Sequence, residues 1–84
     1  MYDLFFVIRS VTYAQRGRDA LSDARIRCSL GRSPRSISTS GCAYTVATSR
    51  EDGPAASVVL KSAAIPYSGP YYRSNNGVYR EISL

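Results

Sequence analysis

The chain has 84 residues, of which 44% are hydrophobic and 20% are charged, and its formal net charge is +5. This length predicts a single domain over residues 1–84, and the composition excludes a disordered chain. The longest apolar run, Leu4–Ile8, is too short to span a membrane or to form the core of a signal peptide. We therefore expect no membrane partner and a cytoplasmic location.

The first predicted element is a strand over residues 2–8, because this segment is aromatic and β-branched and reads as buried on both faces. Ser10 then predicts the N-cap of a helix over residues 11–23. The apolar face of this helix is thin and contains Gly17, which disfavours a helix by about 1 kcal/mol relative to alanine. We therefore expect the helix to lie close against a sheet at Gly17.

Polar and apolar residues alternate over residues 25–30, which predicts a half-buried strand. The alternation places Ile26, Cys28 and Leu30 on the core face, so Cys28 is expected to be structural. Residues 31–41 are rich in glycine, serine, proline and arginine and predict a loop. The next strand is expected over residues 42–48.

Residues 49–54 resemble the start of a helix, with Pro54 in the first turn, and the helix is expected to run to about residue 63. Its predicted buried stripe consists of Ala55, Val58, Val59 and Ser62. Asn76-Gly77 lies between two β-rich runs, which is a strong signal for a hairpin.

The resulting element order, β-α-β-β-α-β with a C-terminal hairpin, predicts an α+β fold. We expect a ferredoxin-like sandwich in which two helices cover one face of an antiparallel sheet. The C-terminal tyrosines are interpreted as part of a half-exposed hairpin or a homodimer contact, because an exposed edge strand favours self-association.

Several chemistries are excluded by residue types that are missing. Histidine is absent, which excludes Cys-His and Ser-His-Asp catalysis and a conventional zinc site with four nitrogen or sulfur ligands. No cofactor is expected. The basic residues comprise ten arginines and one lysine without a run, which is typical of a solvated surface, so we do not expect nucleic acid as a partner. Two cysteines are fewer than small secreted scaffolds use, and this favours free thiols.

The segment over residues 33–44 holds the candidate site, because it places Cys42 after a loop of hydroxyl groups and arginine. Cations and hydrogen-bond donors favour the thiolate, which is the reactive form of cysteine. Arg35 supplies positive charge, and Gly41 permits a tight turn before the thiol. The alternative is that Cys42 is a small hydrophobic residue that opens a strand. The predicted anion-binding residues are Arg35, Ser36, Ser38, Ser40 and Gly41.

The pattern Pro-Arg-x-Ile-Ser-x-Ser followed by a Cys/Gly pair, over Pro34 to Cys42, resembles the putative selenium/sulfur carrier-like family. Many members read Ser-Cys-Gly where this chain reads Ser-Gly-Cys. The resemblance implies a carrier that holds sulfur or selenium on Cys42, as a persulfide or selenide, and passes it between donor and acceptor proteins without turnover of its own. The alternative function is a non-catalytic domain that binds an anion or a protein and in which Cys42 only packs.

Overall fold

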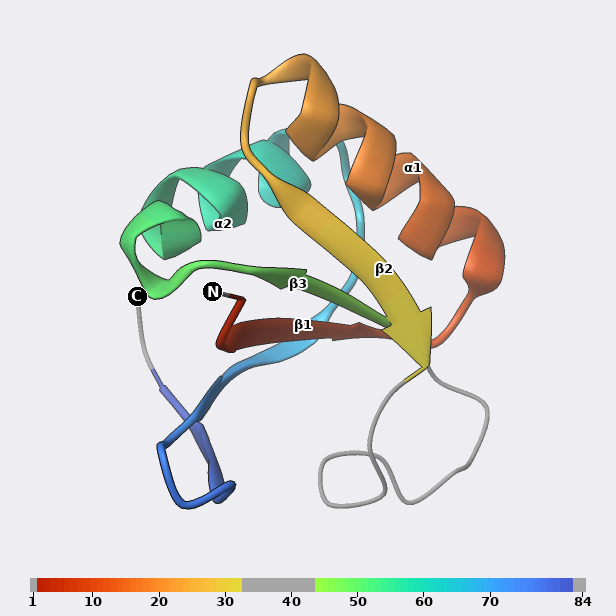
Figure 1. Cartoon of the computed structure of the whole chain (residues 1–84). Helices are drawn as coiled ribbons and strands as arrows, with labels where there is room; N and C mark the ends of the chain where they lie inside the picture. Colours follow the sequence, from red (N-terminus) through yellow and green to blue (C-terminus); the bar gives the residue numbers. More distant parts are fainter. Residues whose placement is uncertain (1, 33–43, 83–84) are drawn as a thin grey trace.

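The computed structural model describes residues 2–32 and 44–82. The elements are β1 (Leu4–Ile8), α1 (Val11–Asp23), β2 (Cys28–Arg32), β3 (Tyr44–Thr48), the 3-10 turn η1 (Arg50–Asp52), α2 (Gly53–Ser62), β4 (Ser68–Arg73) and β5 (Tyr79–Glu81). Within these residues, five antiparallel strands form one sheet in the order β2-β3-β1-β4-β5. Both helices cover the same face of the sheet (Figure 1). The expected α+β, ferredoxin-like sandwich is confirmed.

β1 is the central strand, and it is buried along its whole length as expected. Leu4, Phe6 and Ile8 are fully buried in the core beneath the helices. Phe5 and Val7 face the opposite side of the sheet, because side chains alternate along a strand, and they are buried as well. A strand with pairing partners on both edges and cover on both faces accounts for the unbroken apolar run in the sequence.

α1 has the predicted bounds and begins at the predicted cap, where the Tyr13 backbone amide donates to Ser10 Oγ over 3.5 Å. Its buried positions are Ala14, Gly17 and Leu21. A Cβ built at Gly17 would lie 3.1 Å from Leu60 Cδ2 and 3.5 Å from Ile8 Cδ1. The close approach at Gly17 is therefore confirmed, but the nearest neighbour is on α2 rather than on the sheet.

Both helices end in the same hydrogen-bonded motif, which the sequence analysis did not identify. At the end of α1, the amides of Arg25 and Ile26 donate to the carbonyls of Ser22 and Leu21 over 2.9 and 2.8 Å. This is the Schellman pattern, and Arg25 takes the left-handed conformation that the motif requires, with φ 62°. β2 consequently begins at Cys28, three residues later than predicted.

The end of α2 repeats this motif with different residues. The amides of Ala64 and Ile65 donate to the carbonyls of Lys61 and Leu60 over 3.1 and 3.0 Å, and Ala64 has φ 58°. Glycine is the usual residue at this position because it has no Cβ. Neither helix has glycine there, so the sequence lacked the common signal for these two ends.

The predicted buried stripe of α2 was wrong at Ala55, Val58 and Ser62, which are exposed, whereas Val59 is partly buried against the core. Its buried residues are Gly53, Ala56, Ser57 and Leu60, whereas Val58 is 64% exposed. The stripe is rotated because Ser57, a polar residue, can be buried: its hydroxyl shares a hydrogen bond of 2.7 Å with the Tyr67 hydroxyl.

The C-terminal hairpin of β4 and β5 is confirmed. The Ser74 amide donates to the Val78 carbonyl over 2.9 Å, and the Gly77 amide donates to the Ser74 carbonyl over 2.9 Å. Gly77 has φ 82°, a conformation that glycine adopts without a steric penalty. On the helix-free face, the ring of Tyr79 packs edge-on against Phe5 at 5.4 Å.

Candidate functional site

The predicted site residues Arg35, Ser36, Ser38, Ser40, Gly41 and Cys42 lie outside the described residues. The structure does describe the two points at which their segment joins the sheet. These are Arg32, the last residue of β2, and Tyr44, the first residue of β3, which are register partners. Tyr44 is also the register partner of Ile8, the last residue of β1. Chain connectivity therefore joins the candidate segment to the end of the sheet at which β1 ends.

The N-terminus of α1 lies at this same end of the sheet, because only Arg9 and Ser10 separate it from β1 (Figure 1). A helix N-terminus carries positive partial charge and favours anions. Arg9 adds a full positive charge and is exposed. Sequence reasoning identified Ser10 only as a helix cap and did not connect Arg9 with the candidate site. The pairing of β1 with β3 brings Arg9 to the end of the sheet to which the candidate segment is joined. This antiparallel pairing follows from the topology expected for the fold.

A cavity of about 400 Å³ opens beside the start of α1. Tyr13, on the first turn of α1, lines this cavity and is 39% exposed. The cavity therefore presents both apolar surface and polar groups from the β1–α1 connection at the end of the sheet to which the candidate segment is joined. Its lining consists of Val7, Ile8, Arg9, Ser10, Tyr13, Pro66, Tyr67 and Ser68.

Cys28 lies at the opposite end of β2 from Arg32, with Thr48 as its register partner. At about 3.3 Å per residue, the four steps along the strand from Cys28 to the junction at Arg32 span roughly 13 Å. The expectation that Cys28 points toward the core is confirmed, since its side chain packs against the core cluster. It is half-buried rather than enclosed, because β2 is an edge strand.

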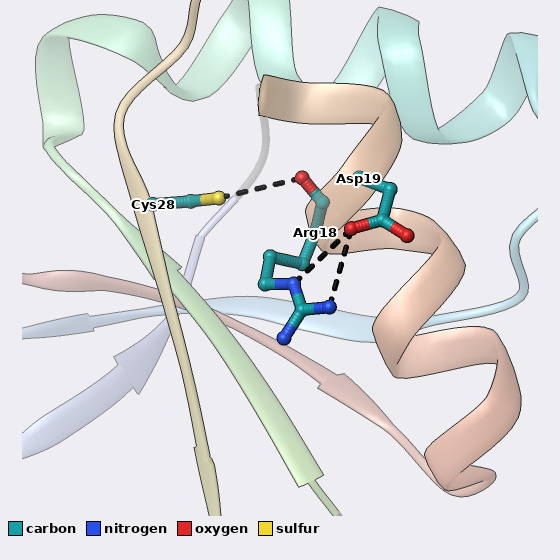
Figure 2. Close-up of polar contacts among 3 residues, drawn as sticks. All are labelled: Arg18, Asp19 and Cys28. Carbon is teal, nitrogen blue, oxygen red and sulfur yellow. Dashed lines mark hydrogen bonds and ion pairs between the residues drawn. The ribbon is translucent and has the colours of Figure 1, made fainter. Parts of the chain in front are cut away.

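The environment of the Cys28 thiol favours its protonated form. Sγ donates to the backbone carbonyl of Arg18 over 3.7 Å, and Figure 2 shows this contact between β2 and α1. Burial raises the pKa of Cys28 above its ordinary value of 9.0, and Asp19 adds to the increase, whereas the Arg18 guanidinium opposes it. A thiol with a raised pKa is a poor nucleophile at neutral pH.

The described residues give no indication of a metal centre or of a membrane span. Within residues 2–32 and 44–82, no three histidine, cysteine, aspartate or glutamate side chains are grouped so that they would hold a metal ion. In the same part of the chain, neither helix combines the length and the apolar character needed to cross a bilayer.

The fold places this chain among small α+β proteins of the ferredoxin-like type. The chain belongs to the putative Se/S carrier protein-like family, whose sequence model matches residues 3–72. The match covers β1 through most of β4, and β5 lies beyond it. Comparison with curated proteins and with solved structures found no match.

Proposed function

We propose that this protein carries sulfur or selenium between partner proteins, with Cys42 as the carrying residue. The Cys42 thiolate would attack the outer sulfur of a donor persulfide, forming a persulfide on Cys42 and releasing the donor as a thiolate. The same exchange with an acceptor thiolate would then regenerate the Cys42 thiolate. Each step exchanges one sulfur–sulfur bond for another, so no external oxidant or reductant is needed.

The observation that supports Cys42 is the condition of the other cysteine. The chain has two cysteines, and Cys28 is half-buried, has a raised pKa and donates its proton to the carbonyl of Arg18. Thiol exchange requires a thiolate that a partner protein can reach. Cys28 meets neither requirement well, so a thiol-based carrier function falls to Cys42.

The surroundings of the two junctions support an anionic sulfur at this end of the sheet. The N-terminus of α1 and the exposed cation Arg9 lie beside the end of β1, whose last residue is the register partner of Tyr44. Both features favour a negative charge. In this proposal Arg35 lowers the pKa of Cys42, and hydrogen-bond donors from Ser36, Ser38, Ser40 and Gly41 stabilise the thiolate. Donor and acceptor proteins of a reducing cytoplasm are the proposed partners.

Loading with a low-molecular-weight persulfide tests the proposal. The protein is treated with glutathione persulfide, and intact-mass spectrometry follows the gain of one sulfur atom that a reductant removes. Wild type and Cys28→Ser are expected to gain this sulfur, and Cys42→Ser is expected not to. Loading that persists in Cys42→Ser and disappears in Cys28→Ser would overturn the assignment. Loading in none of the three proteins would favour a non-catalytic binding or assembly domain.

The two arginines can be tested separately. The rate of Cys42 alkylation by iodoacetamide is measured against pH in Cys28→Ser, with Arg35→Ala or Arg9→Ala added. Each change is expected to raise the pKa of Cys42, because it removes a cation that favours the thiolate. Arg80→Ala, which removes an equal charge from the far edge strand β5, is the control. Superimposed curves for all four proteins would contradict the proposed role of the cations.

A further inference from the structure

A second cavity, of about 380 Å³, lies at the end of the sheet opposite the candidate segment. It opens where α1 ends and β2 begins, and we call it the arginine cavity because three arginines line it. This volume is in the range of small-molecule sites. The lining consists of Tyr2, Arg18, Asp19, Ser22, Arg25, Ile26, Arg27 and Cys28.

The charges around the arginine cavity do not cancel. Asp19 is the single carboxylate in the lining, and its Oδ1 lies 3.2 Å from Arg18 Nη2. Figure 2 shows these two side chains facing one another. Among the described residues, no carboxylate lies within ion-pair distance of Arg25 or Arg27. Two positive charges are therefore left on one small concave surface, together with the hydroxyl groups of Ser22 and Tyr2 as further donors.

The hydrogen-bonded motif at the end of α1 does not require these arginines. Cations near a helix C-terminus are stabilised by its carbonyl groups. Here backbone amides already bond the carbonyls of Leu21 and Ser22. The matching position at the end of α2 is Ala64, with nearly the same φ as Arg25. The motif therefore forms without an arginine side chain at this position.

We propose that the arginine cavity binds a phosphate dianion, either as inorganic phosphate or as the terminal phosphate monoester of a small metabolite. The two uncompensated guanidinium groups match its two negative charges. Guanidinium groups also bind phosphate oxygens in a bidentate manner, which favours phosphate over a simple halide. The site lies at the other end of β2 from the Cys42 segment, so it does not depend on the proposed carrier function.

Titration with inorganic phosphate tests this site, with NMR shifts of the backbone amides as the readout. Saturable shifts are expected at residues 25–28. Arg25→Ala and Arg27→Ala are each expected to weaken binding by about tenfold, as for the loss of a charge-assisted hydrogen bond. Arg25→Ala should fold normally, because Ala64 occupies the same backbone conformation. Arg16→Ala is the matched control, since it removes one charge from α1 at a residue outside the cavity lining.

Alkylation of Cys28 gives a second readout, because its thiol lines the same cavity. In Cys42→Ser, phosphate is expected to slow alkylation by iodoacetamide, a neutral reagent, whereas the same ionic strength of chloride is not. Tighter binding of glycerol phosphate than of phosphate would identify a metabolite ester as the ligand, and equal or weaker binding would identify free phosphate. Equal loss of affinity in Arg16→Ala, or shifts confined to the start of α1, would overturn the proposal.

Discussion

The thiol of Cys28 and the carbonyl oxygen of Arg18 lie 3.7 Å apart and connect edge strand β2 to the middle of α1. The contact uses the proton of the thiol, so it exists only while Cys28 is neutral. The same half-buried position raises the pKa of Cys28 above 9.0. Packing of α1 on β2 is thereby coupled to the protonation state of one cysteine.

This coupling predicts a pH dependence of stability with a definite sign. Because the pKa of Cys28 is higher in the folded than in the unfolded chain, the folded state retains the proton more strongly. The contribution is fully present below the ordinary pKa of 9.0 and is lost as the pH rises through the folded pKa. The free energy of unfolding of wild type should therefore fall more steeply than that of Cys28→Ser as the pH rises above about 9.

Urea denaturation at a series of pH values measures this difference. Subtracting the Cys28→Ser curve removes the contribution that all other groups make to both proteins. Parallel curves for the two proteins would show that Cys28 titrates alike in the folded and unfolded chains.

The hydroxyl pair of Ser57 and Tyr67 predicts a loss of stability when it is broken. Tyr67→Phe keeps the edge-on packing against Phe6 but leaves the Ser57 hydroxyl, which is 7% exposed, without its partner. An unsatisfied buried hydroxyl costs about 1–3 kcal/mol. Thermal denaturation should show this loss in Tyr67→Phe, little change in the control Tyr13→Phe, and partial recovery in Tyr67→Phe with Ser57→Ala. Additive losses in the double variant would argue against the pairing.

The approach of α1 to α2 at Gly17 predicts that a larger side chain is not accommodated. A Cβ there would already lie 3.1 Å from the fully buried Leu60, and Ile65 Cγ2 is 3.6 Å away. Gly17→Val is expected to lower the free energy of unfolding by about 1–3 kcal/mol through overpacking. Gln15→Val, at an exposed position of the same helix, should change it by less than about 0.5 kcal/mol. Unchanged or higher stability in Gly17→Val would contradict overpacking, because valine has a higher helix propensity than glycine.

The left-handed residue at the end of α2 predicts a stabilising substitution. Ala64 has φ 58°, where a Cβ is unfavourable by about 1 kcal/mol, and glycine avoids this strain. Ala64→Gly should therefore raise the midpoint of urea denaturation. Ala63→Gly, one residue earlier at φ −86°, is the matched control and should lower it, because glycine there only adds freedom to the unfolded chain. A lower midpoint in both variants would rule out relief of strain at Ala64.

Local signals predicted most of the fold. The apolar run of β1, the Ser10 cap of α1 and the Asn76-Gly77 turn each have a cause within a few residues, and each was located correctly. The start of β2 and the buried face of α2 were not located correctly, because they depend on contacts that exist only in the folded chain. Arg25 and Ala64 adopt the left-handed conformation, which is rare for arginine and alanine and therefore hard to predict from the sequence. Ser57 is buried because its hydroxyl bonds that of Tyr67, which is ten residues away.

The sequence located the surroundings of the candidate site less completely. Alternation showed which way Cys28 points, but it did not show that β2 is an edge strand, so the half-buried thiol and the arginine cavity beside it were missed. Arg9 was missed because its connection to residue 44 runs through the pairing of β1 with β3. The roles of Arg35 and Cys42 stay predictions.

The central position of β1 also has a consequence for biosynthesis. β1 leaves the ribosome well before β4, yet one of its edges pairs with β4, where Leu4 and Tyr72 are register partners. Until β4 has emerged, a nascent chain exposes an unpaired edge of its most apolar strand, and such edges are prone to aggregation. Release of residues up to Arg73 is therefore the step that allows β4 to cover the second edge of β1.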